Sequence, residues 1–111
     1  MSQTYEENPA EMDRWLRRCD EVLALIDCAL RGCRTGSHPV VQQSLSESIR
    51  CMELASEDVA GRVLGIFDFC LSESGQGRFD EAAEVLVELK ENWAQAIATI
   101  RRDRSRAANL N

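Results

Sequence analysis

The feature that most constrains the fold is the regular apolar repeat in RFDEAAEVLVELKENW, residues 78–93, which continues through residues 94–100. Val85 and Val87 lie on the two flanks of this repeat, so the apolar sector widens to roughly 200°, against ~100° for a helix with one neighbour. The segment therefore predicts a helix with two helical neighbours, or with one neighbour and a bound partner. The central stripe, at 3.6 residues per turn, consists of Phe79, Ala82, Ala83, Leu86, Leu89, Trp93, Ala96, Ile97 and Ile100.

Three further segments carry helical signals. Asn8 is a good N-cap, Pro9 suits the first helical position, and apolar residues then recur every three or four positions for about six turns. A second helix is expected after the turn at residues 34–39, a break near Ser56 separates it from a third, and the polar loop 72–78 precedes the last. These segments and their short turns predict an all-α, antiparallel four-helix bundle.

The chain length of 111 residues suits a single domain. We expect a flexible N-terminal segment at residues 1–8, the helical bundle at residues 9–100, and a basic, frayed C-terminal tail at residues 101–111. The formal charge of -6 divides into +3 on this tail, which has four arginines and one aspartate, and therefore -9 on the rest. We interpret the tail as a solvated basic end that follows an acidic helix.

The acidic balance argues against nucleic acid as a partner, because phosphate binding needs a cationic face. The opening residues are polar and acidic, unlike a secretory leader, and no apolar run approaches membrane-spanning length, so we expect no membrane insertion. The five cysteines are odd in number and include no Cys-x-x-Cys pair, which fits free structural thiols. These features together predict a cytoplasmic protein.

The sequence shows no pattern of residues that is typical of an enzyme's active site. The single histidine, His38, excludes the histidine pairs of di-iron bundles and zinc proteases, and its place in a turn favours a cap or an exposed side chain. The glycines of the loop 72–78 follow a helix rather than a strand, unlike a phosphate-binding loop. We therefore expect no catalytic residues, no metal site and no cofactor.

Several segments, taken in order, resemble the flagellin-specific export chaperone family FliS. Tyr5-Glu-Glu-Asn8 and the helix start Asn8-Pro9-Ala-Glu-Met are similar to that family's Tyr-x-x-Asn segment and Ser-Pro-Glu-Glu-Leu helix start. DVAGRVLGIFDFCL, residues 58–71, resembles the family stretch that ends in Leu-Tyr-Asp-Tyr, and EAAEVLVELKENW, residues 81–93, resembles its last helix. The similarity spans nearly the whole chain.

This resemblance implies a four-helix cytoplasmic chaperone that binds the C-terminal region of flagellin or of a related secreted client. Such a protein prevents premature polymerisation and delivers its client to the flagellar type III export apparatus. By position, Tyr5 and Asn8 would belong to a segment that covers the empty client groove. Residues of the third and fourth helices would line that groove, and our candidates are Phe67, Phe69, Val85, Leu86, Leu89 and Trp93.

Two alternatives use the same features. The wide apolar sector would also suit a self-associating helical bundle with a structural or regulatory role, so a homodimer is compatible with the sequence. A regulatory partner protein whose Arg-rich end docks on an acidic protein or nucleic acid is the second alternative. Within the apolar set, Leu86, Leu89 and Trp93 also fit a plain bundle core, whereas Phe69, Val85 and Val87 lie off the main stripes and discriminate better.

Overall fold

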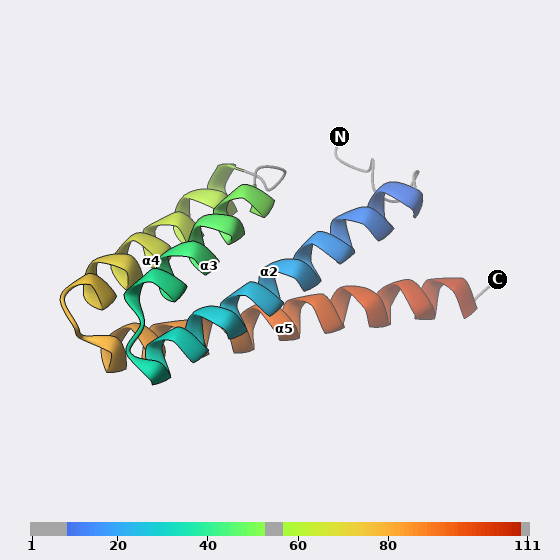
Figure 1. Cartoon of the computed structure of the whole chain (residues 1–111). Helices are drawn as coiled ribbons and strands as arrows, with labels where there is room; N and C mark the ends of the chain where they lie inside the picture. Colours follow the sequence, from blue (N-terminus) through green and yellow to red (C-terminus); the bar gives the residue numbers. More distant parts are fainter. Residues whose placement is uncertain (1–8, 53–56, 110–111) are drawn as a thin grey trace.

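The computed structural model describes residues 9–52 and 57–109, and this part of the chain consists of four helices and no strands (Figure 1). The predicted all-α four-helix fold is confirmed. The helices are α2 (Pro9–Thr35), α3 (His38–Cys51), α4 (Glu57–Gly75) and α5 (Phe79–Asn109). Tyr5 and Asn8, which we assigned to a groove-covering segment, lie outside the described residues.

The helix boundaries follow local sequence signals. Gly36 adopts a φ of 68°, a left-handed conformation that glycine accepts, and the backbone N–H of Ser37 donates to the carbonyl of Gly32 at 2.8 Å. The Ser37 hydroxyl then caps α3 by accepting from the Val40 N–H at 3.4 Å. The break predicted near Ser56 lies outside the described residues, since α3 ends at Cys51 and the next described helix, α4, begins at Glu57.

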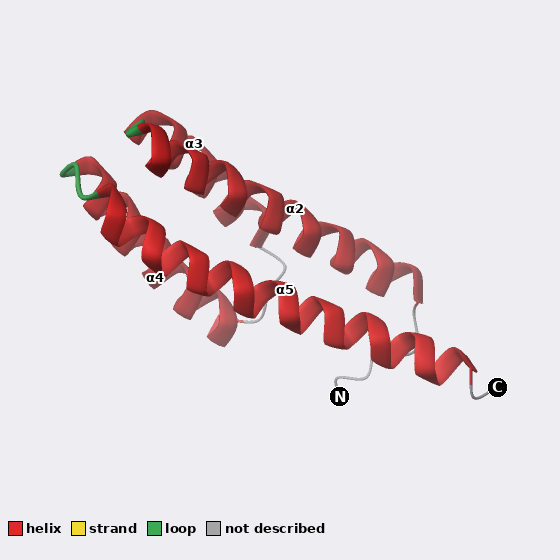
Figure 2. Cartoon of the chain, turned by 90° about the horizontal axis from the view of Figure 1, so that it is seen from below, coloured by secondary structure: helices red, strands yellow, loops and turns green. Residues whose placement is uncertain are grey.

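Each helix packs mainly on two others. α2 packs against α3 and α5, and α4 packs against the same two helices, so α2 and α4 lie diagonally across the bundle. The helices differ greatly in length, because α2 and α5 have 27 and 31 residues whereas α3 and α4 have 14 and 19. As a result α2 and α5 project together beyond the ends of the shorter pair (Figures 1 and 2).

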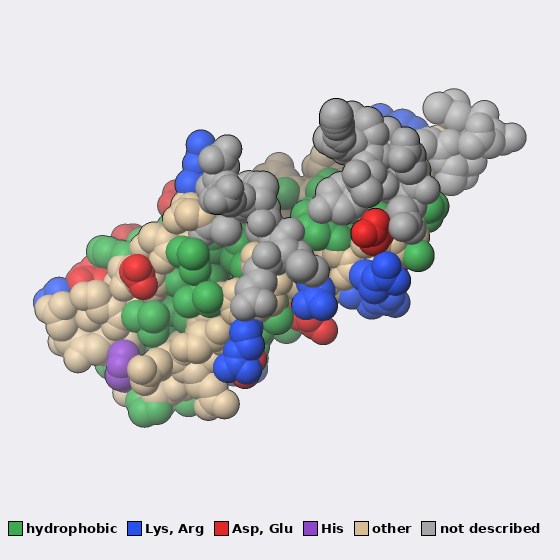
Figure 3. Space-filling model, turned by 90° about the horizontal axis from the view of Figure 1, so that it is seen from above, with side chains coloured by type: hydrophobic (Ala, Val, Ile, Leu, Met, Phe, Trp, Pro, Cys, Tyr) green, Lys and Arg blue, Asp and Glu red, His purple; other side chains and the backbone are tan. Residues whose placement is uncertain are grey.

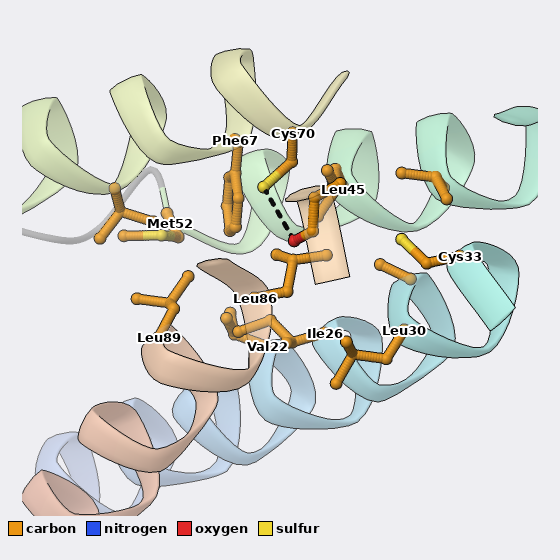
Figure 4. Close-up of a cluster of buried hydrophobic side chains, with 14 residues drawn as sticks. Val22, Ile26, Leu30, Cys33, Leu45, Met52, Phe67, Cys70, Leu86 and Leu89 are labelled. Carbon is orange, nitrogen blue, oxygen red and sulfur yellow. Dashed lines mark hydrogen bonds between the residues drawn. The ribbon is translucent and has the colours of Figure 1, made fainter. Parts of the chain in front are cut away.

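The main core lies where all four helices overlap (Figure 4). Its centre holds Phe67, Ile26, Leu45 and Leu86, all of which are fully buried. α2 and α3 approach closely at Gly32, where a Cβ atom would lie only 2.9 Å from Cγ2 of Val41. A glycine at this position therefore sets the close contact of the two helices.

One end of the bundle carries both the α2–α3 turn and the α4–α5 loop, and we call it the loop end. A side-chain contact links α3 to α4 there. Nδ1 of His38, at the start of α3, lies 2.8 Å from the hydroxyl oxygen of Ser74, near the end of α4. Because the Ser74 hydroxyl donates its own hydrogen to the Leu71 carbonyl at 3.2 Å, the His38 nitrogen acts as the donor to Ser74. His38 is thus a packed link between two helices, and Ser37 rather than His38 is the cap of α3.

The C-terminal end differs from the sequence-based expectation. We expected a frayed tail from residue 101, but α5 continues as a helix to Asn109. Arg101 and Arg104 form ion pairs with Asp20 and Asp13 of α2, so part of the basic charge is used inside the molecule. The N-terminal part of α2 lies beside this end of α5 and explains the difference, because an isolated helix end would lack these contacts and would fray.

Candidate functional site

The projecting parts of α2 and α5 form a two-helix arm, which we define as residues 9–20 and 96–109. The level at which α3 stops is marked by its last residue, Cys51, whose Sγ lies 4.0 Å from Oε1 of Glu21 on α2. Beyond that level neither α3 nor α4 runs beside the arm (Figures 1 and 2). The arm is therefore half of a four-helix bundle, with two of its four helical positions unfilled by α3 and α4.

The arm has a second, smaller apolar cluster. Its buried members are Leu16, Cys19 and Ile97, which join α2 to α5. Larger side chains are only partly buried around them, namely Met12, Trp15, Trp93 and Ile100. Two of these four are indoles, which offer large rigid contact area to a partner. The arm thus presents an apolar face that the shorter helices do not reach.

Trp93 stands at the base of the arm and packs against both the main core and the arm cluster. Its indole Nε1 donates a hydrogen bond to the backbone carbonyl of Cys19 at 3.0 Å. This contact satisfies the polar atom of a large apolar ring and fixes the height of α5 against α2.

Three ion pairs join α2 to α5 along one flank. Asp13, Asp20 and Asp27 are spaced seven residues apart and so form one row on α2. Their partners are Arg104 at 2.6 Å, Arg101 at 2.7 Å and Lys90 at 2.7 Å. The hydrogen bond from Arg104, opposed by a smaller effect of burial, lowers the pKa of Asp13. These pairs lie on the α5 side of α2, while the α3 side of α2 carries Gly32 and Glu21.

The structure separates the six predicted groove residues into two groups. Phe67 and Leu86 are fully buried and Leu89 is 9% exposed, so these three belong to the core of the closed bundle. A client on the surface could contact them only after the bundle opened. Trp93 and Val85 are half-buried and Phe69 is 44% exposed, which leaves them at the surface.

The two flanking valines do not form one site. Val87, which is 41% exposed, lies one helical turn before Lys90 on the flank of α5 that meets α2. Val85 is about 200° away around the helix, on the flank that meets α4, and packs partly against the main core. The helical wheel therefore predicted two flanks correctly, but a single client helix lying along α5 would contact only one of them.

Sequence reasoning missed the apolar face of the arm as a separate surface. Met12, Trp15 and Ile100 stood in the predicted apolar stripes, but nothing distinguished them from core residues. The spacing of caps and loops along the sequence could have revealed this face, because it makes the first and last helices about twice as long as the second and third. In an antiparallel bundle such a difference leaves the ends of the long helices without two of their neighbours.

The cysteines behave as packed apolar residues. All five are free, and Cys19, Cys33 and Cys70 are buried. Burial raises the pKa of Cys19 to about 11 and that of Cys70 to about 12, so both remain protonated at neutral pH. Cys28 is half-buried beside a shallow pocket of about 330 Å³ between α2 and α3. This arrangement fits the structural role expected from the sequence.

In the part of the chain with assigned positions, no group of three or more His, Cys, Asp or Glu side chains could hold a metal ion. None of the described helices combines the length and the apolar character needed to cross a bilayer.

Comparisons of the chain with known protein families, with curated protein sequences and with solved structures gave no match.

Proposed function

We propose that this protein is a non-enzymatic chaperone that binds a helical segment of a secreted client, with the C-terminal region of flagellin as the first candidate. In this role it acts in the cytoplasm, prevents premature polymerisation of the client and delivers it to the flagellar type III export apparatus. The ordered resemblance of residues 5–12, 58–71 and 81–93 to the FliS family supports the choice of client.

The observation that carries the proposal is the apolar face of the arm. An amphipathic client helix placed there would take one of the positions that α3 and α4 leave unfilled, and would cover Met12, Trp15, Trp93 and Ile100. If the client buries about four large side chains of its own at about 2 kcal/mol each, the gain exceeds the 2 to 5 kcal/mol or so that ordering a short segment costs. No catalytic residue enters this mechanism.

The proposed contact set therefore changes from the one expected from sequence. Trp93 stays at its centre, and the remaining contacts come from the arm. Phe69 and Val85 belong to a second surface on the side of α4 and α5. Phe67, Leu86 and Leu89 support the helices from within the core.

Isothermal titration calorimetry of the full chain against the C-terminal segment of flagellin from the same organism tests the proposal. We expect binding at micromolar concentration, with loss on Ile100→Asp and retention with Val40→Asp. Val40 is the matched control because it is 42% exposed and lies on α3 near the loop end of the bundle, away from the arm. Circular dichroism verifies that both variants keep their helices. The absence of heat with wild-type protein at tens of micromolar would sink the flagellin assignment.

Self-association is the second candidate function, and the same apolar face favours it. Two arms packed against each other would fill the unfilled helical positions of both copies. Mass measurement in solution separates the two functions. A tight dimer at micromolar concentration in the absence of a client supports self-association, whereas a monomer that binds the client supports the chaperone.

A further inference from the structure

We propose that Cys28 of α2 is a modification site, at which small disulfides that carry carboxylates, such as oxidised glutathione, form a mixed disulfide with the protein. The site is the shallow pocket of about 330 Å³ between α2 and α3, which Cys28, Arg31 and Ser44 line together. Small-molecule sites measure about 300 to 1,000 Å³, so this pocket suits a small reagent. It lies near the loop end, away from the arm, and the site is therefore independent of the proposed function.

The sulfur of Cys28 faces a cation. Nη2 of Arg31, one helical turn later on α2, donates a hydrogen bond to Sγ of Cys28 at 3.0 Å. Arg31 forms no ion pair with any described residue, so its guanidinium has donors left for an incoming anion. A carboxylate that binds this guanidinium brings the disulfide attached to it within reach of the sulfur.

Ser44 of α3 adds a buried hydroxyl that has no partner. The residue is only 7% exposed, and among the described residues it takes part in a hydrogen bond through its backbone carbonyl alone, which accepts from the Ser48 hydroxyl. No described side-chain oxygen or nitrogen that is sealed from solvent lacks a partner, so the Ser44 hydroxyl reaches solvent through the pocket that it lines. Gln43 lines the same pocket and offers an amide donor. One cation and two neutral donors thus surround a space that fits a carboxylate.

The carboxylates that flank the pocket in the sequence are already paired. The chain has 19 acidic residues but none between Asp27 and Glu47, a stretch that contains every residue lining the pocket. Asp27 forms an ion pair with Lys90 at 2.7 Å, and Glu47 forms one with Arg50 at 3.7 Å. Figure 3 shows hydrophobic and other uncharged surface around the purple histidine at the start of α3. The pocket is therefore locally cationic in a chain with a formal charge of -6.

Cys51 has the opposite environment in the same molecule. It is also half-buried, but its Sγ lies 4.0 Å from Oε1 of Glu21. Glu21 precedes Cys28 by roughly 10 Å along α2, about one Debye length, so its charge acts mainly on Cys51. Burial, followed by the charge of Glu21, raises the pKa of the Cys51 thiol, and Arg18 opposes the rise. A reagent with negative charge is therefore favoured at Cys28 and disfavoured at Cys51.

The reaction is a thiol–disulfide exchange. The Cys28 thiolate attacks one sulfur of the reagent, and the S–S bond of the reagent breaks as the new S–S bond forms. The other half of the reagent leaves as a thiolate and takes up the proton that Cys28 has lost. Cys28 is thereby oxidised to a mixed disulfide, and the departing half is reduced to a free thiol.

Two reagents of similar size and opposite charge test the site in the full chain. Dithiodipropionate carries two carboxylates, and cystamine carries two ammonium groups. Mass spectrometry of peptides gives the initial rates at Cys28 and Cys51 near pH 8, and the ratio of the two rates cancels the intrinsic reactivity of each reagent. We expect the ratio of Cys28 to Cys51 to be about tenfold higher with dithiodipropionate than with cystamine, and the difference to shrink in 1 M salt.

Variants of the pocket sharpen the test. Arg31→Gln should reduce the tenfold difference to about twofold or less, because the carboxylate loses its cation. Ser44→Ala should slow dithiodipropionate at Cys28 about threefold and leave cystamine unaffected. Arg34→Gln is the matched control, since it removes the same charge one turn further along α2 from a residue that does not line the pocket. Circular dichroism verifies that all three variants keep their helices.

The inference has clear failing outcomes. The same rate ratio with both reagents, or an equal effect of Arg34→Gln and Arg31→Gln, would overturn charge selection at Cys28. Failure of Cys28 to react with either reagent would overturn the site itself. With oxidised glutathione as the reagent, the first mixed disulfide should form on Cys28, and its first appearance on Cys51 would contradict the assignment.

Discussion

The indole Nε1 of Trp93 and the backbone carbonyl of Cys19, which are 74 positions apart in the chain, are joined by a hydrogen bond of 3.0 Å. The bond links the last helix to the first at the point where the four-helix core gives way to the arm. It therefore fixes how far α5 is shifted along α2, and with it which residues meet in the arm cluster.

Trp93→Phe removes this hydrogen bond but keeps an aromatic ring in place. We expect the free energy of unfolding to fall by about 1–2 kcal/mol, because the bond and some apolar contact are both lost. Urea denaturation followed by circular dichroism measures the change. Val87→Ala is the control, because this side chain is 41% exposed, and it should cost less than about 0.5 kcal/mol. Equal losses in the two variants would contradict a positioning role for Trp93.

Gly32→Ala tests the close approach of α2 and α3. The added Cβ would lie 2.9 Å from Cγ2 of the buried Val41, so we expect destabilisation of about 1–3 kcal/mol despite the better helix propensity of alanine. Gly61→Ala provides the matched comparison, because nothing lies within 4 Å of its added Cβ. That variant should gain up to about 1 kcal/mol, as measured by the midpoint of thermal unfolding.

The Asp20–Arg101 pair should contribute weakly to stability. Both side chains are nearly half exposed, and exposed ion pairs typically contribute about 0.2–1 kcal/mol. A double-mutant cycle with Asp20→Asn and Arg101→Gln measures this coupling, which we expect to vanish in 1 M salt. Replacing Arg101→Gln by Arg102→Gln in the cycle gives the control, since Arg102 contacts Thr99 and should show no coupling to Asp20.

Acid should destabilise the protein through two carboxylates. Hydrogen bonds from Arg104 and Arg78 lower the pKa of Asp13 and Glu73 below their usual 3.8 and 4.5. The folded state thus binds these protons less readily than the unfolded state, so the stability is present above pH 4.5 and is lost as the pH falls through the lowered values. The difference in melting temperature between pH 6 and pH 3 should shrink in Asp13→Asn/Glu73→Gln. Glu88→Gln, which removes a surface carboxylate that forms no ion pair with any described residue, should leave that difference intact.

High pH should destabilise the folded protein through the buried thiols. Burial raises the pKa of Cys70 from 9.0 to about 12, so the folded state retains a proton that the unfolded state loses. This contribution to stability is present below pH 9 and declines as the pH rises from 9 to about 12. Cys70→Ala should flatten that decline.

In native protein near pH 8, a thiol reagent should modify the half-buried Cys28 and Cys51 before the three buried cysteines, as mass spectrometry of peptides would show.

Signals that are local in the sequence determined the class of fold and most helix boundaries. The Gly36–Ser37 turn and the repeat of residues 79–100 each act within a few residues along the chain, so they are readable without a structure. The helical state of residues 101–109 is different. It depends on α2 lying alongside, with Asp20 opposite Arg101 across 81 positions, and no local signal contains that pairing.

For the candidate site, too, some properties follow from the sequence and others only from the packing of the helices. Periodicity identified Phe67, Leu86 and Trp93 as members of apolar stripes, but a stripe looks identical whether it faces a neighbouring helix or a bound client. Only the packing of the four helices decided that Phe67 and Leu86 lie in the core and that Trp93 lies at the base of an arm that α3 and α4 do not cover. The sequence by itself determined which side chains avoid water. The tertiary structure decided which of them have a neighbour, because that depends on how far each helix extends beside the others.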